Sequence, residues 1–442
     1  MILIHNGLVI TRDPARPLIE GGAVLVEGNR IVWVGKGPEP EPFPAGLSGV
    51  PERIDAGGGL VMPGFINAHT HCYSTFARGM AAKPAAGFEE VLRNLWWRLD
   101  KGLSPEDLYY SAVPPMIDSI RSGVTSIIDH HASPFAVSGS LRAIAAAAAL
   151  LGLRCNLCYE VSDRDGEEIA LQGIRENRDF ARECGGRHDD MAGSLFGLHA
   201  QMTLSDRTLD RCLVEAGDTG FHVHAAEGTG DVNDALAKYG MRAVERLYRR
   251  GILGPKTLAV HCVHVNREEI AMLRESGALV IHNPQSNMAN AVGTCPAPEL
   301  MGRGVLVGLG SDGYTADMTE SYKTAAILHK HHAGNPSAAW AEPPKMFFEN
   351  NRIIMNRLME GETGILREGA YADIIVVDYK PPTPLHAGNL DAQLLFGLSG
   401  RLTDTALING RVVMRRRELP GIDEEALLAK SREHARALWN RI

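Results

Sequence analysis

Apolar, strand-like runs alternate with segments of helical length through the middle of the chain. Eight runs can be recognised, and in order they are GLVMPGFI, VTSIID, LRCNLCYE, SLFGLH, GFHVHA, TLAVHC, ALVIH and GVLVGLG. Alternation of strands with helices predicts βα units around a parallel sheet. Eight strands in roughly 300 residues predict a (β/α)8 barrel, a fold that commonly uses about 250 residues as one unit. We therefore expect a protein of the α/β class.

Polar side chains follow these runs at the points where the strands are expected to end. They are His69 and His71, then Asp129, His130 and His131, then His199, His224, Glu227, His261, His282 and Asp312. The carboxyl ends of the strands in such a barrel meet at one mouth, where the active sites of this fold lie. We therefore expect these side chains to form a functional site at that mouth.

Four of these residues form a pattern typical of metal ligands. His69 and His71 are two residues apart, so on an extended strand both imidazoles point to the same side. A pair of this kind alone is more often structural than ligating. His224 in HVHAAE and Asp312 in GLGSDG add a third imidazole and a carboxylate at other strand ends. Three imidazoles, one carboxylate and a water molecule suit zinc or another first-row divalent ion.

The two ends of the chain share a second pattern of short strands. MILIHNGLVI, AVLVEGNRIVWVG and RIDAGGGLVMPG occupy the start, and ADIIVVDY and TALINGRVVMRRREL lie near the end. Within the last run, Asn409-Gly410 is a strong signal for a hairpin turn. We expect residues 1–58 and 363–442 to combine into one β-domain that flanks a catalytic part at 59–362. The final pattern EEALLAKSREHARALWNRI predicts a closing amphipathic helix.

The charge balance and the cysteines argue against several other classes of protein. The chain has 45 Lys and Arg against 53 Asp and Glu, a formal net charge of −8, so nothing draws it to nucleic acid or to an anionic membrane surface. The longest apolar run, Ala143–Leu153, is far shorter than the roughly 20 residues of a membrane-spanning helix. The N-terminus lacks the pattern of a signal peptide, and seven scattered cysteines suit a reducing compartment. We expect a cytoplasmic protein whose partner is a small molecule.

Several motifs carry a resemblance to a known family. PGFINAHTH, HVHAAE, LAVHCVH, HNPQSN and GLGSDG, in this order, resemble the amidohydrolase superfamily, specifically its cytosine-deaminase-like branch of aminohydrolases and chlorohydrolases. GETGILREGAYADIIVVD and INGRVVM are similar to the C-terminal β-domain of that branch. LWWRLD and DHHASP resemble the subgroup of aminohydrolases called SsnA. The resemblance covers nearly the whole chain and implies a distorted (β/α)8 TIM barrel with a composite β-sandwich built from both termini.

The resemblance also implies a role for each site residue. The ligands of a single divalent ion, zinc or alternatively iron, would be His69, His71, His224 and Asp312. Asp312 would also take a proton from the water that attacks the substrate. Glu227 would carry that proton to a ring nitrogen. His261 would hydrogen-bond the attacking oxygen.

Two residues, His199 and Glu227, indicate which branch of the superfamily the chain resembles. Its binuclear members use a carboxylated lysine at the fourth strand, and this chain has no lysine between Lys101 and Lys238. His199 stands at that place and resembles a substrate-contacting position of the mononuclear branch. Glu227 favours deamination over dechlorination, because some relatives that expel chloride lack this glutamate.

The connection between the first two strands is rich in aromatic residues and long enough to fold over the mouth. We expect Trp97 to stack on a flat heterocycle, while packing of a helix against the barrel is the alternative for it and for Trp96. His282, after the seventh strand, is expected to line the pocket. One of His130 and His131 is expected to face the mouth, and the sequence does not say which.

These features together predict a metal-dependent hydrolase that deaminates a nitrogen heterocycle, such as a purine, pyrimidine or triazine, and releases ammonia. The alternative at the same site is expulsion of chloride or an alkylamine, or opening of a cyclic amide. A non-catalytic barrel scaffold is a remoter alternative, because it predicts erosion of a ligand set that is complete here. The sequence leaves open the heterocycle, the choice between zinc and iron, and the oligomeric state, for which the resemblance suggests a homodimer.

Overall fold

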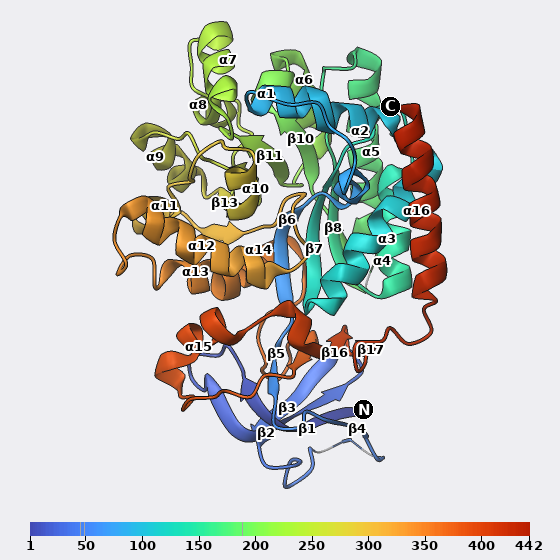
Figure 1. Ribbon diagram of the computed structural model, residues 1–442, viewed down its shortest axis with the longest axis vertical. Helices are drawn as coiled ribbons and strands as arrows, with labels where there is room; N and C mark the ends of the chain where they lie inside the picture. Colours follow the sequence, from blue (N-terminus) through green and yellow to red (C-terminus); the bar gives the residue numbers. More distant parts are fainter. Residues whose placement is uncertain (45, 48, 188) are drawn as a thin grey trace.

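Eight strands in the middle of the molecule are buried along their whole length and lie in two parallel sheets. The computed structural model describes residues 1–44, 46–47, 49–187 and 189–442 (Figure 1). The first sheet has the order β6 (Phe65–Thr70), β7 (Val124–His131), β8 (Arg154–Tyr159) and the short β9 (Ala192–Ser194). The second has the order β10 (Phe196–Ala200), β11 (Phe221–Ala225), β12 (Leu258–His261), β13 (Leu279–His282) and β14 (Val307–Leu309). Parallel strands covered on both faces appear as continuous apolar runs, which is why the sequence marks them.

The two parallel sheets are connected at both edges. Thr70 at the end of β6 forms a parallel bridge with Asp312, which follows β14. Val161, just after β8, forms a second parallel bridge with Leu198 of β10. Each of the eight apolar runs therefore supplies one strand to the parallel sheets of an α/β arrangement, as the sequence predicts, while the short β9 overlaps the fourth run only at Ser194.

Helices follow the strands and surround the parallel sheets (Figure 1). They are α3 (Pro105–Arg121), α4 (Ser140–Leu151), α5 (Glu167–Gly185), α6 (Asp206–Ala216), α7 (Thr229–Tyr239), α8 (Ala243–Arg249), α9 (Arg267–Ser276), α10 (Pro284–Ala289), α11 (Ala297–Gly302), α12 (Met318–Ala333), α13 (Glu342–Pro344) and α14 (Asn351–Leu358). The start of α9 shows how the sequence sets a boundary, because Asn266 Oδ1 accepts from Glu269 N at 2.9 Å and Glu269 Oε2 accepts from Asn266 N at 3.1 Å. Among the helices of the described residues, none combines the length and apolar character needed to cross a membrane.

Strands from both ends of the chain form one eight-stranded sheet below the parallel sheets in Figure 1. Its strands are β1 (Ile2–Ile10), β2 (Leu18–Glu27), β3 (Arg30–Lys36), β4 (Glu52–Asp55), β5 (Leu60–Pro63), β15 (Ile374–Val377), β16 (Thr403–Ile408) and β17 (Arg411–Met414). The antiparallel pairing of β5 with β15 brings the two ends together. Between β16 and β17, Asn409 and Gly410 have φ values of 51° and 73°, as a two-residue hairpin turn requires. The expected union of the termini in one sheet and the expected hairpin are confirmed.

The first apolar run differs from its prediction as a single strand. Its first part is β5, which pairs with β1 and β15, and its second part is β6, which pairs with β7. The break falls at Pro63-Gly64, and a Cβ at Gly64 would lie 2.1 Å from Thr125 Cγ2. Only glycine fits where the chain crosses from one sheet to the other, and this close approach is a tertiary contact that a local apolar pattern does not contain.

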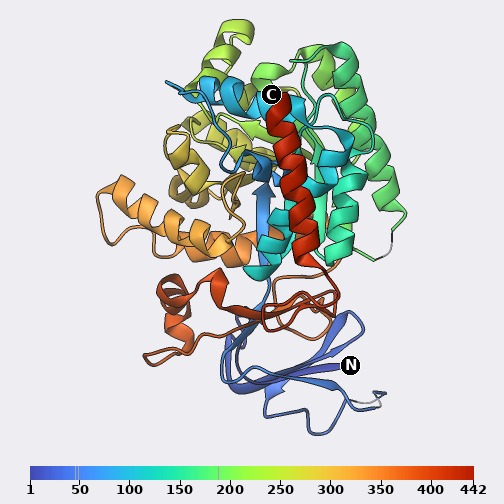
Figure 2. The same cartoon turned by 45° about the vertical axis from the view of Figure 1, so that its right-hand side comes forward.

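The closing helix is α16 (Glu424–Arg441). Asp423 caps it, because its side chain accepts a hydrogen bond from Ala426 N at 3.0 Å. The helix crosses back from the terminal sheet and packs along α3 (Figure 2). Near its end, Trp439 Nε1 donates to the carbonyl oxygen of Phe76 at 2.6 Å. The amphipathic helix predicted for the last residues is therefore confirmed, and it holds the C-terminus against α3 and the segment that contains Phe76.

A buried ion pair ties the terminal sheet to the parallel sheets. Arg154 on β8 and Asp373, directly before β15, have side chains that are 0% and 1% exposed. Arg154 donates to both carboxylate oxygens of Asp373, at 3.0 and 3.1 Å. We expect Asp373→Ala to lower the free energy of unfolding by about 3–5 kcal/mol in urea titrations, because it leaves a buried guanidinium without its partner.

The matched control removes an ion pair at the surface. Glu52→Ala breaks the exposed pair between Glu52 and Arg415 and should change the free energy of unfolding by less than about 1 kcal/mol. If Asp373→Ala costs as little as Glu52→Ala, the buried pair does not join the two parts of the molecule energetically.

Candidate metal centre and active site

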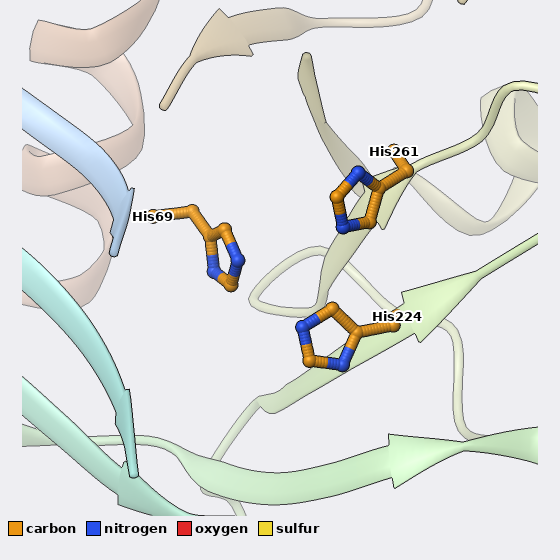
Figure 3. A group of neighbouring side chains, drawn as sticks. All are labelled: His69, His224 and His261. Carbon is orange, nitrogen blue, oxygen red and sulfur yellow. The ribbon is translucent and has the colours of Figure 1, made fainter. Parts of the chain in front are cut away.

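The ends of strands β6, β11 and β12 and the segment after β14 bring five predicted site residues together. Ligand atoms of His69, His224 and His261 lie within 4.8 Å of one another, and their rings face a common point (Figure 3). Ligand atoms of His69, His71 and Asp312 form a second group of the same size. The residues that the sequence places at separate strand ends are therefore neighbours, as the parallel arrangement requires.

The distances between these atoms match those between ligands of one metal ion. His71 Nε2 lies 3.2 Å from His224 Nε2 and 3.4 Å from Asp312 Oδ1. Nitrogen and oxygen ligands bind Zn²⁺ at about 2.0–2.1 Å, so in a tetrahedral site they lie about 3.3 Å apart. Without a cation between them, two imidazole nitrogens at 3.2 Å need a proton to avoid lone-pair repulsion. The described residues therefore fit a divalent ion.

Hydrogen bonds fix which nitrogen of each histidine is free for a metal ion. His71 Nδ1 donates to the carbonyl oxygen of His130 at 2.6 Å, and His224 Nδ1 donates to that of His199 at 2.8 Å. His69 Nδ1 lies 2.8 Å from His222 Nε2, while His69 Nε2 is buried without a hydrogen-bond partner among the described residues. All three imidazoles therefore offer the Nε2 lone pair, the arrangement typical of metal-binding histidines.

Burial and neighbouring groups set the protonation states of these residues so that they can bind a cation. Burial, followed by the neighbouring histidines, lowers the pKa of His69 and His224 well below its usual value, so both rings are neutral ligands. Burial by itself raises the pKa of Asp312, but His71, His261 and hydrogen bonds from Ser286 and Gly313 outweigh it and lower that pKa. Asp312 is therefore an anion beside the neutral imidazoles of His69 and His224.

Glu227 and His261 lie beside this group. Glu227 Oε2 is 3.4 Å from His261 Nε2, which is in turn 3.6 Å from Asp312 Oδ2. Burial, then the charges of Asp312 and Asp231, raise the pKa of Glu227 well above its usual value, which favours the protonated carboxyl. His261 Nδ1 lies 2.8 Å from Asn287 Oδ1, to which it donates. His261 and Asp312 also have positive φ values of 73° and 56°, a strained backbone of the kind that clusters at active sites.

A cavity opens over these residues. His71, His224, Glu227, His261 and Asp312 form one side of its wall. Trp96, Trp97 and His199 also line it, and the rings of Trp97 and His199 are 6.1 Å apart in an edge-to-face arrangement. The expectation that Trp97 and His199 face the pocket agrees with this lining, while their contact with substrate stays a prediction.

The connection after His71 lies over the mouth of the cavity. It contains η1 (Cys72–Ala77), α1 (Phe88–Val91), η2 (Leu92–Trp96) and α2 (Trp97–Gly102). A Cβ at Gly228 would lie 2.9 Å from Phe88 Cδ1, and one at Gly230 would lie 1.8 Å from Glu89 Oε1. Two glycines after β11 thus let α1 approach closely, and the expected cover over the mouth is present.

Other predicted residues take different positions. His130 faces the histidine group, with its ring 4.7 Å from that of His224. His131 turns away, and its Nε2 lies 2.9 Å from Ser133 Oγ. His282 is not among the residues that line the cavity, and its ring lies 5.1 Å from that of His329. Contact between His282 and the substrate therefore stays a prediction that the lining does not support.

Sequence reasoning missed His222 and Glu160. His222 orients His69, and its signal was present in GFHVHA, where His222 and His224 have the same two-residue spacing as His69 and His71. Glu160 ends the third apolar run, LRCNLCYE, and lines the cavity. The position of Glu160 at the end of an apolar run was the signal that could have identified it as a site residue.

The partner of His69 gives a testable prediction. His222→Leu removes the acceptor that fixes the His69 ring, so we expect zinc affinity to fall about 10–100-fold. Competition with a chromophoric chelator measures the affinity. His222→Gln keeps an acceptor near the same place and is the matched control. Unchanged affinity in His222→Leu would show that His69 does not depend on this contact.

The sequence matches the amidohydrolase family over residues 60–413. It is 32% identical to a 5'-deoxyadenosine deaminase of Methanosarcina acetivorans, over 99% of this chain and 98% of that protein. It is also 32% identical to a 5-methylthioadenosine/S-adenosylhomocysteine deaminase of Pelotomaculum thermopropionicum, over 100% and 99%. A zinc-bound adenosine deaminase from Xanthomonas campestris has a similar structure, with a TM-score of 0.87, 25% identity and coverage of 99% and 98%. The chain therefore belongs to the amidohydrolase family, within its aminohydrolase branch.

Proposed function

We propose that this protein is a metal-dependent hydrolase that deaminates a purine of the adenosine type and releases ammonia. The observation that carries the proposal is the juxtaposition of three imidazole Nε2 atoms, the Asp312 carboxylate and the Glu227 carboxyl group at one end of a cavity. The curated relatives named as deaminases of adenosine derivatives support the substrate class. Expulsion of chloride or an alkylamine and opening of a cyclic amide are outcomes of the test below.

We also infer that the two parallel sheets close into one distorted barrel, with the terminal sheet as part of a β-sandwich. The bridges from Thr70 to Asp312 and from Val161 to Leu198 support closure. The division at residues 58 and 362, the cytoplasmic location and the homodimer stay predictions. A zinc ion is the proposed occupant of the histidine group, and iron is the alternative.

His69, His71, His224 and Asp312 would hold the ion. When bound there, a divalent ion supplies Lewis acidity, which lowers the pKa of water towards neutrality. Asp312 accepts the proton that the attacking water loses, because its carboxylate is anionic and lies beside His71 in the group that would hold the ion. His261 holds the attacking oxygen in place, since its Nδ1 is bonded to Asn287 and its Nε2 faces Asp312 and Glu227.

Glu227 supplies the proton that makes the ring reactive. A proton on its carboxyl is donated to a ring nitrogen as water adds to the neighbouring carbon. Asp312 then passes its proton to the amino group, which leaves as ammonia, and the proton of the added hydroxyl returns to Glu227 as the ring carbonyl forms. The heterocycle lies against Trp97, whose ring offers a flat apolar face on the cavity wall. The side chains of Glu227 and Asp312 are only 12% and 13% exposed, which limits the access of bulk water to these proton transfers.

The charge of the cavity predicts a preference among substrates. Its lining includes six acidic residues, Glu89, Asp100, Glu160, Glu227, Asp231 and Asp312, and no Lys or Arg among the described residues. Even with Glu227 protonated, the acidic groups outnumber any basic ones on this wall. A substrate that brings a phosphate into this wall meets like charges, which cost several kcal/mol. We expect kcat/KM for adenosine to exceed that for adenosine 5'-monophosphate by about 100-fold or more. Equal kcat/KM values for the two compounds in initial-rate assays would contradict the inference that the cavity wall repels a phosphate group.

Ammonia release from a panel of ring compounds tests the function itself. Zinc-loaded protein is offered adenosine, 5'-deoxyadenosine, guanine, cytosine and a chlorotriazine, with ammonia and chloride measured separately. We expect ammonia from at least one adenine compound and no chloride. Release of chloride without ammonia would support the alternative function, in which chloride is the leaving group. Absence of product from every compound would exclude the proposed substrate class.

A further inference from the structure

Two crossed ion pairs join α2, in the cover over the cavity, to the loop that follows β8. Arg164 Nη2 in the loop donates to Asp100 Oδ2 on α2. The next residue of α2, Lys101, pairs with the next residue of the loop, Asp165, with 2.6 Å between Nζ and Oδ1. Arg164 Nε also lies 3.3 Å from Asp165 Oδ2. These four side chains, which we call the latch, have no role in the proton transfers above.

The latch is largely buried. The side chains of Arg164, Asp100 and Asp165 are 10%, 2% and 6% exposed. Loss of one partner from a buried ion pair is strongly destabilising, because the other charge is left uncompensated. The pairs therefore hold α2 against the loop, which an exposed pair of the same length would do only weakly.

The loop that carries Arg164 is itself anchored through the preceding residue, Asp163. The carboxylate of Asp163 accepts from Ser205 N and from Thr208 Oγ1, both at 2.6 Å. Asp163 N donates to the carbonyl oxygen of Thr203 at 2.9 Å. These contacts tie the loop to the first turn of α6 and to the segment before it. Arg164 therefore extends towards the cover from a fixed base.

Arg164 also lies against the ring of Trp97. Its guanidinium carbon is 5.2 Å from the centre of that ring, within the roughly 6 Å over which a cation is attracted to an aromatic face. Trp97 and Asp100 line the cavity, whereas Arg164 is not among the described residues that do so. Any effect of Arg164 on a bound substrate therefore passes through the two residues that it contacts.

We propose that Arg164 is a positioning residue that fixes the Trp97 ring on the cavity wall. Trp97 is the first residue of α2, and Asp100 lies three residues further on, so the ring contact and the ion pair constrain the same turn of helix. A ring that is held in place in advance binds a flat heterocycle without the entropy cost of ordering it. The inference rests on the proposed function and adds to it the residue on which stacking of the heterocycle depends.

A double-mutant cycle tests whether Arg164 acts through Trp97. We expect Arg164→Met to raise KM for the best adenine compound about tenfold and to leave kcat within about threefold, because the variant loses binding rather than a reacting group. In a Trp97→Leu background, the same change should alter KM by less than about twofold, since the ring that Arg164 holds is gone. Arg207→Met, which breaks an exposed pair with Glu167, is the matched control and should keep KM within about twofold.

Hydrogen exchange gives a second readout that needs no substrate. Amides of residues 92–102 should exchange at least about tenfold faster in Arg164→Met than in the wild type, because the latch no longer holds α2. Arg207→Met should match the wild type. If the unpaired Asp100 prevents Arg164→Met from folding, the double variant Arg164→Met/Asp100→Asn is compared with Asp100→Asn in both experiments, since it leaves that pair without a bare charge.

Three results would overturn the proposal. They are an unchanged KM in Arg164→Met, an equal rise in KM with and without Trp97, and equal exchange of residues 92–102 in Arg164→Met and the wild type. The second of these would show that Arg164 acts on the protein as a whole rather than on the ring. Absence of ammonia release from every adenine compound would instead remove the proposed function, and the exchange measurement would then decide on the latch alone.

Discussion

Replacement of Glu227 by glutamine should reduce kcat/KM for the best adenine substrate by about 10³-fold, because general acid–base groups typically contribute 10²–10⁴-fold. The amide has nearly the same size and cannot hold a transferable proton. Glu227 is placed for this task by its contact with His261 and by burial, which raises its pKa well above the usual value and so favours the protonated carboxyl. Initial rates of ammonia release measure the loss.

Zinc content separates this catalytic loss from loss of the metal site. Glu227→Gln should retain the zinc of the wild type, since Glu227 is not among the proposed ligands. Glu275→Gln changes an exposed glutamate in the same way and should leave the rate within about twofold, as is usual for surface changes. A Glu227→Gln enzyme that keeps most of its activity would remove the proposed proton donor from the mechanism.

Asp312→Asn should be at least as damaging, for two reasons that act together. It removes the proposed anionic ligand, whose Oδ1 lies 3.4 Å from His71 Nε2, and with it the group proposed to accept the proton of water. Groups that merely orient metal ligands are worth 10–100-fold in affinity, so we expect loss of a charged ligand to exceed about 100-fold. We expect the rate to fall by about 10³-fold or more even at saturating zinc, because the proton acceptor is lost as well.

The two effects of Asp312→Asn are distinguished by titrating the rate with zinc. Recovery of full activity at high zinc would show that the aspartate serves only as a ligand. Asp118→Asn, an exposed aspartate that pairs with Arg78, is the control and should match the wild type in both affinity and rate. Wild-type zinc affinity in Asp312→Asn would exclude this residue from the metal centre.

Local patterns were sufficient for much of the fold. The parallel strands are buried on both faces and therefore appear as apolar runs, and Asn409-Gly410 forms the expected hairpin because positive φ values are accessible to both residues. The division of the first run into β5 and β6 was not predictable in this way. It depends on the close approach of Gly64 to Thr125, which only the packed sheets create.

Local sequence patterns were also insufficient for part of the candidate site. Spacing and position at strand ends were enough to bring His69, His71 and His224 together, because the fold itself aligns those ends. The choice between His130 and His131 required the twist and packing of β7. His222 contacts Nδ1 of His69, and the carboxylate of Glu160 lies beside Nδ1 of His130. Such contacts are set by side-chain packing rather than by sequence spacing.

The measurement that tests the central claim most directly is deamination of an adenine compound by zinc-loaded protein in water enriched in heavy oxygen. Hydrolytic deamination adds one oxygen from water to the ring carbon that loses the amino group. We predict one heavy oxygen atom in each product molecule and one ammonia released for each product formed, with both lost on removal of the metal. A product without heavy oxygen, or no product from a fully zinc-loaded enzyme, would contradict the account.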